Sequence, residues 1–178
     1  MMAMIKTMAE IGLATPGDVA GMLDLQNQNL TSQGGTLSVA FSRHWFESAI
    51  ADMPVIVARK EDRIIGYVLS SRFATQTHLS IVRAMLSAYP ASGTAYLYGP
   101  ICVAQSERGS GLAGKLFVAL CIQLPGREGV TFIRSDNNAS LKAHAKMGMI
   151  QVAGFTHDDL EYVVVEYRPE HPQRRIVV

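Results

Sequence analysis

A glycine-rich heptapeptide stands between a β-rich run and an apolar helical pattern, Arg108-Gly109-Ser110-Gly111-Leu112-Ala113-Gly114. Glycines at such a junction let several backbone N–H groups point into one concavity, and the start of the helix adds a partial positive charge. We therefore expect residues 108–114 to seat an anion, most naturally a phosphate or a pyrophosphate.

The charge balance of the chain agrees with a seat of this kind. Lys and Arg number 16 against 15 Asp and Glu in 178 residues, which gives a net charge of +1. A nearly neutral protein lacks the electrostatic footprint of a nucleic-acid binder, so an anionic ligand must be held by a few placed groups. The hydrophobic fraction of 48% excludes a disordered chain.

Cysteines and hydrophobic runs indicate where the protein resides. Cys102 and Cys121 stand in apolar runs without a CxxC or Cys/His ligand spacing, which predicts reduced thiols and no metal site. Residues 1–15 contain no continuous apolar core of a secretory signal. Pro and Gly interrupt the least charged stretch, residues 84–106, so it does not read as a membrane span. We expect a cytoplasmic protein with no membrane and no nucleic-acid partner.

Strand and helix patterns alternate along the chain. Hydrophobic periodicity predicts strands at 4–14, 54–59, 64–73, 94–103, 130–135, 149–157 and 160–169, and helices starting near 15, 42, 78, 111 and 139. This order predicts an α/β (α+β) fold with a mixed sheet and helices on both faces. We expect one domain over residues 1–170 and a C-terminal tail over 171–178.

The heptapeptide has two interpretations. Gly109-x-Gly111-x-x-Gly114 is the dinucleotide fingerprint, and Asp136 lies near the offset of its ribose-binding acid. That fingerprint normally follows its strand directly and is followed by further βαβ units. Here residues 104–108 intervene, and an antiparallel pair ends the chain, so a nicotinamide-binding enzyme is the weaker interpretation.

Read as Arg108-x-x-Gly111-x-Ala113, the same stretch resembles the (Gln/Arg)-x-x-Gly-x-(Gly/Ala) signature of the GNAT superfamily of acyl-CoA-dependent N-acyltransferases. A second stretch has the spacing of the family's Asn-x-x-Ala-x-x-x-Tyr-x-Lys-x-Gly-Phe, namely Asn137-x-x-Ser140-x-x-x-His144-x-Lys146-x-Gly148-Met149, with departures at positions 140, 144 and 149. The run YLYGPICVAQSERG resembles the family's splayed fourth strand and its loop. The motifs cover residues 96–149.

The resemblance implies a mostly antiparallel sheet of about seven strands and acetyl-CoA as the co-substrate, with no metal. In the family, backbone amides of the glycine loop bind the pyrophosphate, which implies the positions Arg108, Gly109, Ser110, Gly111, Leu112 and Ala113. The pantetheine arm pairs with the splayed strand, here Ile101, Cys102 and Val103. The second motif implies Asn137 as a pantetheine ligand or helix cap, and Lys146 as a phosphate contact or a solvated lysine.

The implied reaction is attack of a neutral amine on a thioester. It needs donors for the oxyanion, for which the Val103 N–H is a candidate, and an acid for the departing thiolate. His144 occupies the slot of the family's tyrosine acid, so it is either the acid or thiolate stabiliser or a helix residue without a catalytic role. The reaction also needs a base for the amine. The strand at residues 94–103 has no Asp or Glu, so Tyr98 is a polar candidate for this role, and packing in the core is the alternative.

Several questions stay open on the sequence. Glu107 is expected to be solvated, and Arg134 either binds an acidic acceptor or forms a surface ion pair. The resemblance implies an amine acceptor whose identity is set by residues 30–42 and 157–160. A non-catalytic CoA-binding module on the same scaffold is the alternative function, and a homodimer is compatible with the resemblance.

Overall fold

The computed structural model describes residues 8–35, 37 and 39–169. The strands are β1 (Glu10–Leu13), β2 (Ile56–Lys60), β3 (Arg63–Ser71), β4 (Tyr96–Val103), β5 (Gly129–Arg134), β6 (Ile150–His157) and β7 (Leu160–Tyr167). The helices are α1 (Val19–Asn29), α2 (Arg43–Asp52), α3 (Phe73–Gln76), α4 (Ser80–Ala88), α5 (Leu112–Gln123) and α6 (Asn138–Lys146), with short 3₁₀ turns η1 (Pro16–Asp18), η2 (Thr31–Gln33) and η3 (Gln105–Glu107).

The strands form one mixed sheet in the order β1-β2-β3-β4-β5-β7-β6. The pairs β1–β2, β2–β3, β5–β7 and β6–β7 are antiparallel, whereas β4 and β5 are parallel. This arrangement confirms the predicted mixed α/β sheet of about seven strands.

Strand β4 pairs with β5 over only the first part of its length. Tyr96 and Leu97 lie opposite Gly129 and Val130, and the ladder ends there although β4 continues to Val103. Gly99 follows with φ of 91°, a left-handed conformation that glycine adopts at no steric cost, and Pro100 has no N–H to donate. The Gly-Pro step therefore marks the point where β4 departs from its parallel neighbour.

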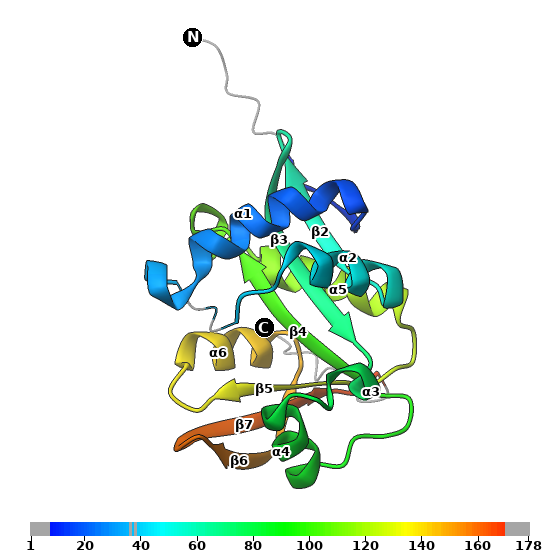
Figure 1. The fold of residues 1–178 in the computed structure, drawn as a ribbon, viewed down its shortest axis with the longest axis vertical. Helices are drawn as coiled ribbons and strands as arrows, with labels where there is room; N and C mark the ends of the chain where they lie inside the picture. Colours follow the sequence, from blue (N-terminus) through cyan, green and yellow to red (C-terminus); the bar gives the residue numbers. More distant parts are fainter. Residues whose placement is uncertain (1–7, 36, 38, 170–178) are drawn as a thin grey trace, which may run out of the picture. The chain divides into compact units, whose positions relative to one another are not determined.

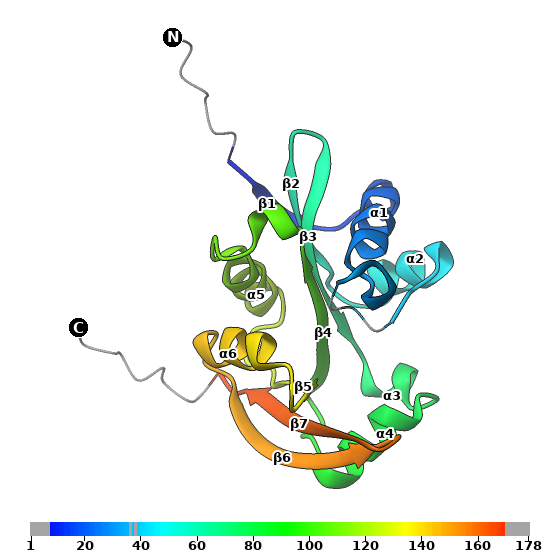
Figure 2. The ribbon, with the colours of Figure 1, turned by 90° about the vertical axis from the view of Figure 1, so that its left-hand side faces the viewer.

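Contacts divide the described chain into two units, and the first contains residues up to Leu69 together with Pro100–Gln123. Figure 2 shows α1 and α2 on one side of β2 and β3, and α5 on the other. Neighbouring residues of β3 face opposite sides of the sheet. A Cβ at Gly66 would meet the side chains of Leu112 and Leu116, while Tyr67 is buried with the α1 and α2 core.

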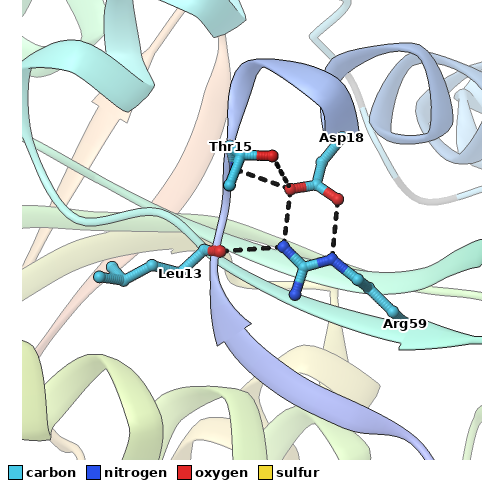
Figure 3. A network of polar contacts seen from close by, with 4 residues as sticks. All are labelled: Leu13, Thr15, Asp18 and Arg59. Atoms are coloured by element: carbon cyan, nitrogen blue, oxygen red, sulfur yellow. Dashed lines mark hydrogen bonds and ion pairs between the residues drawn. The ribbon is translucent and has the colours of Figure 1, made fainter.

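A charged network fixes the start of α1 against β2 in this first unit (Figure 3). Asp18 accepts the Thr15 main-chain N–H at 2.7 Å and the Thr15 hydroxyl at 2.9 Å. The Arg59 guanidinium donates to both Asp18 oxygens, at 2.8 and 2.7 Å, and to the Leu13 carbonyl at 2.9 Å. The hydrogen bond from Arg59 holds the pKa of Asp18 at about 2, so the network carries a fixed ion pair at neutral pH.

The second unit contains Ser70–Gly99 and the described chain from Leu124 onward. Helix α4 packs on β6, beside β7 (Figure 1). Consecutive residues of β4 again face different helices, because Leu97 belongs to the cluster formed with Val82 and Met85 of α4. Tyr98 lies against His144 and Met147 at the end of α6.

The element boundaries differ from the expectation at three places. Strand β1 begins at Glu10 rather than at residue 4, and residues 4–7 lie outside the described residues. The short helix α3 starts at Phe73, where the sequence predicts the end of a strand, and α4 starts at Ser80 rather than 78. Residues 171–178 also lie outside the described chain, so the tail and the single domain stay predictions.

Candidate active site

The glycine loop has the backbone conformation that an anion seat requires. Gly109 and Gly111 have φ angles of 75° and 81° on either side of Ser110. A Cβ at either glycine would meet no atom within 4 Å, so glycine is needed for its backbone angle and not for space. Alternation of left-handed residues turns successive N–H groups toward one side of the chain.

Helix α5 supplies further donors to the same loop. The Lys115 N–H donates to the Gly111 carbonyl at 3.2 Å. The N–H groups of Leu112 and Ala113 precede this bond and have no acceptor within the helix, as is general for a first turn. The Leu112 side chain is buried on the β3 side and anchors the turn. Within this range the N–H groups of Arg108 and Ser110 donate to the Gln105 and Glu107 carbonyls at 3.3 and 3.4 Å. The donors left for a pyrophosphate are therefore those of the first turn of α5, at the helix end.

The residues predicted to contact the pantetheine lie in the same unit as this loop. Cys102 is buried, whereas Ile101 and Val103 are half-buried. Burial raises the pKa of the Cys102 thiol to about 12, so the thiol is protonated at neutral pH and packs as an apolar side chain. Only the main chain of residues 101–103 is available for polar recognition of a ligand.

Arg108 is the cation of the loop. Its side chain is exposed, and its Nη2 donates to Asn29 Oδ1 at 2.7 Å. Asn29 was not predicted from the sequence, because it lies 79 residues away and belongs to neither motif. Glu107, expected to be solvated, is instead paired with Lys60 Nζ at 2.9 Å and mostly covered; the sequence does not reveal this partner on β2.

The second motif lies in the second unit. Asn137 Oδ1 accepts the Ser140 N–H at 3.1 Å, so Asn137 caps α6, one of its two predicted roles. Lys146 is exposed in the last turn of this helix, where a cation favours the helix dipole. The Arg134 guanidinium pairs with Asp136, which is the surface ion pair weighed as one interpretation of the sequence.

His144 and Tyr98 form a buried aromatic contact. Their rings meet edge to face with centroids 5.6 Å apart, and the exposed fractions are 5% for His144 and 1% for Tyr98. The Tyr98 hydroxyl donates to Met147 Sδ at 3.7 Å. The structure therefore brings together the two residues that the sequence suggested for the chemistry.

The hydrogen bonds of His144 define its tautomer. Nδ1 lies 2.8 Å from the Ser140 carbonyl oxygen, which only accepts, and 3.3 Å from the Ser140 hydroxyl, which can accept as well as donate. We assign the proton to Nδ1, because this tautomer satisfies both contacts. Burial lowers the pKa of His144 below 6.5, although the bond to Ser140 opposes this shift. The neutral ring therefore has a lone pair on Nε2. A neutral Nε2–H donor to a thiolate requires the opposite tautomer.

The described part of the chain contains neither a cluster of metal ligands nor a membrane-spanning helix. No three His, Cys, Asp or Glu side chains within it gather in a way that could hold a metal ion. None of its helices is long and apolar enough to cross a membrane.

Comparison with known families decides the affiliation. Residues 19–149 match the acetyltransferase (GNAT) family. The chain belongs to the GNAT acetyltransferase family. The match spans both motifs, so the resemblance in the sequence is confirmed and the dinucleotide-binding interpretation is set aside. No curated protein matches the sequence significantly.

Solved GNAT structures have the same fold. An N-acetyltransferase from Staphylococcus aureus Mu50 is 20% identical, with a TM-score of 0.68 over 91% of this chain and 99% of its own. A putative acetyltransferase from Salmonella typhimurium, solved with its cofactor acetyl-CoA, is 16% identical, with a TM-score of 0.69 over 97% and 100% of the two chains. The ribosomal-protein-S18-alanine N-acetyltransferase of Escherichia coli is 10% identical, with a TM-score of 0.66 over 96% and 100%.

Proposed function

We propose that this GNAT protein transfers the acetyl group of acetyl-CoA to the nitrogen of an amine. The observation that carries the proposal is the loop at residues 108–113, where two glycines in the left-handed conformation precede a helix with unused first-turn donors. The family and the structure of a neighbour solved with acetyl-CoA support this assignment. The activity belongs in the cytoplasm, as the sequence predicts.

In this proposal, the binding of the donor rests on main-chain groups. The N–H groups around Gly109 and Gly111 bind the pyrophosphate, and exposed Arg108 adds one positive charge. The pantetheine arm pairs with residues 101–103 of β4, beyond the point where the ladder to β5 ends. The Val103 N–H polarises the thioester carbonyl as negative charge develops on its oxygen.

The transfer forms a C–N bond and breaks the C–S bond of the thioester. The attacking nitrogen must be neutral, and it loses one proton while the departing sulfur gains one. In the tautomer described above, Nε2 of His144 carries a lone pair. We therefore assign to Nε2 the role of a hydrogen-bond acceptor in the reaction, and not that of a neutral N–H donor to the thiolate. Tyr98 holds the edge of this ring through their edge-to-face contact.

A direct assay separates this enzyme from a non-catalytic CoA-binding module, which the lack of Asp and Glu on β4 would favour. The protein is incubated with acetyl-CoA and a panel of amines, including polyamines, amino acids and peptides with free N-termini, while free thiol is followed. The proposal predicts thiol release above background with at least one amine, matched by acetylated product. Binding of CoA without release on every amine would support the module.

A further inference from the structure

Two consecutive residues of opposite charge stand at the entrance of the glycine loop, and each has a defined partner in the first unit. Arg108 Nη2 donates to Asn29 Oδ1 at 2.7 Å. Glu107 Oε1 lies 2.9 Å from Lys60 Nζ. Neither Asn29 on α1 nor Lys60 on β2 belongs to the two sequence motifs.

Contacts other than the one with Arg108 hold the side-chain amide of Asn29 in place. The side chain is 4% exposed, and its Nδ2 donates to the Leu25 carbonyl at 2.8 Å. With the amide nitrogen committed in this way, Oδ1 faces Arg108. The Asn29 carbonyl also accepts the Leu37 N–H at 2.9 Å, so its main chain is held as well.

An amide orients a guanidinium without neutralising it. A carboxylate at position 29 would form an ion pair with Arg108 and cancel its charge, whereas the neutral Oδ1 leaves the full positive charge. The guanidinium has five N–H donors, and the contact with Asn29 uses one nitrogen. Arg108 is therefore held in place and still offers charge and donors to an anion.

The contact between Lys60 and Glu107 has the complementary effect. A lone carboxylate next to Arg108 would repel a phosphate and attract the guanidinium. The Glu107 and Lys60 side chains are only 22% and 25% exposed, so solvent screens their attraction incompletely. The ammonium group thus neutralises the acidic residue beside the seat.

We propose that Asn29 and Lys60 are positioning residues that set the charge of the anion seat for a polyanionic acyl donor. Asn29 acts through Arg108, and Lys60 acts through Glu107. This inference rests on the proposed function and assigns that site two residues outside its motifs.

The first test measures CoA affinity by calorimetry for Asn29→Asp and Asn29→Ala. The aspartate variant should bind CoA about tenfold more weakly, because its carboxylate neutralises Arg108. The alanine variant removes the orienting acceptor without adding charge and should lose about threefold. Thermal melting of each variant checks that it folds, since the introduced carboxylate would face the Leu25 carbonyl.

The second test substitutes the half-buried Lys60 and Glu107 in place of the fully buried Asn29. Lys60→Met leaves Glu107 unpaired and should weaken CoA binding about threefold, while Glu107→Gln leaves Lys60 unpaired and should strengthen it by a similar factor. The double variant Lys60→Met, Glu107→Gln should return to the wild-type affinity. Loss of packing alone would weaken binding in all three variants.

A phosphate-free donor provides the specific control. The acetyl thioester of N-acetylcysteamine lacks every phosphate, so its kcat/KM should be the same in wild type and in all variants, and added salt should narrow the differences in CoA affinity. The inference would be overturned if the variants bound CoA as wild type does. It would also be overturned if their kcat/KM with the phosphate-free donor fell as much as their CoA affinity. A wild-type protein that binds no CoA would instead overturn the proposed function.

Discussion

His144 Nδ1 donates to the Ser140 carbonyl at 2.8 Å, one helical turn earlier on α6. This bond leaves the lone pair on Nε2 and fixes the imidazole plane beside Tyr98. The position that the family gives to a proton-donating tyrosine therefore holds a hydrogen-bond acceptor. The consequences can be measured in turnover and in its pH dependence.

Replacing His144 should affect turnover more than binding. His144→Phe keeps an aromatic ring against Tyr98 but removes Nε2, and we expect kcat to fall about 100-fold with unchanged CoA affinity. His44→Gln, on an exposed position of α2, is the control and should leave both quantities unchanged. Unaltered kcat in His144→Phe would remove His144 from the mechanism.

The pH profile tests the charge state of the same ring. Burial lowers the pKa of His144 below 6.5, so its neutral form predominates at pH 7. As the pH falls through this lowered pKa, protonation removes the acceptor, and kcat should fall. The acidic limb assigned to this group should be absent from the residual activity of His144→Phe. A rise of kcat on acidification would instead identify the imidazolium as the acid.

Gly111→Ala should damage both stability and binding. Its φ of 81° costs an L-residue about 1–2 kcal/mol, and relaxation of that strain would turn the neighbouring N–H groups away from the pyrophosphate. Gly126→Ala is a matched control, because Gly126 has a φ of 71° and open space at its Cβ, outside the loop. Urea unfolding should show similar losses for both, whereas CoA affinity should fall only in Gly111→Ala. If the two variants bound CoA with equal affinity, the loop would not be part of the CoA site.

The Asp18–Arg59 pair should make stability depend on pH in the acid range. The pKa of Asp18 is 3.8 in the unfolded reference and about 2 in the folded protein. The stabilisation is complete above the unfolded value and is lost as the pH falls through the folded one. Asp18→Asn should cost about 1–2 kcal/mol of unfolding free energy at pH 7, and the difference from wild type should shrink as the pH falls below 3.8 and disappear only below pH 2. Exposed Asp24→Asn on α1 should show no such effect.

Two hairpin turns permit an internal comparison. Glu61 and Asp158 occupy the same first position of two-residue turns, with φ angles of 50° and 48°. Asp and Asn tolerate this left-handed conformation better than Glu does. Glu61→Asn should therefore raise the unfolding free energy by about 1 kcal/mol, while Asp158→Asn should change it by less. Equal gains in urea unfolding would contradict this account of the strain.

Local signals in the sequence predicted much of the fold. The alternation of apolar residues located all seven strands, the glycines located the loop before α5, and Asn137 marked the start of α6. Each of these features depends on residues within a few positions of one another. Helix α3 was missed, because a four-residue turn has no periodicity to detect.

Polar pairs between residues far apart in the chain could not be predicted from the sequence. Asp18 and Arg59 are 41 residues apart, and Arg108 and Asn29 are 79 apart. Such pairs are set by which strand and helix lie side by side, and neither residue signals the other. The motifs therefore predicted the position of the candidate site, while its electrostatics and the tautomer of His144 required coordinates.

Acetyl transfer by this protein can be tested by titrating the wild type with CoA and acetyl-CoA and then measuring the release of free thiol over a panel of amines. We expect saturable binding that is weaker in Gly111→Ala, and turnover with at least one amine that yields one acetylated amine per thiol released. No binding of either nucleotide, or binding with thiol release no faster than hydrolysis on every amine, would contradict it.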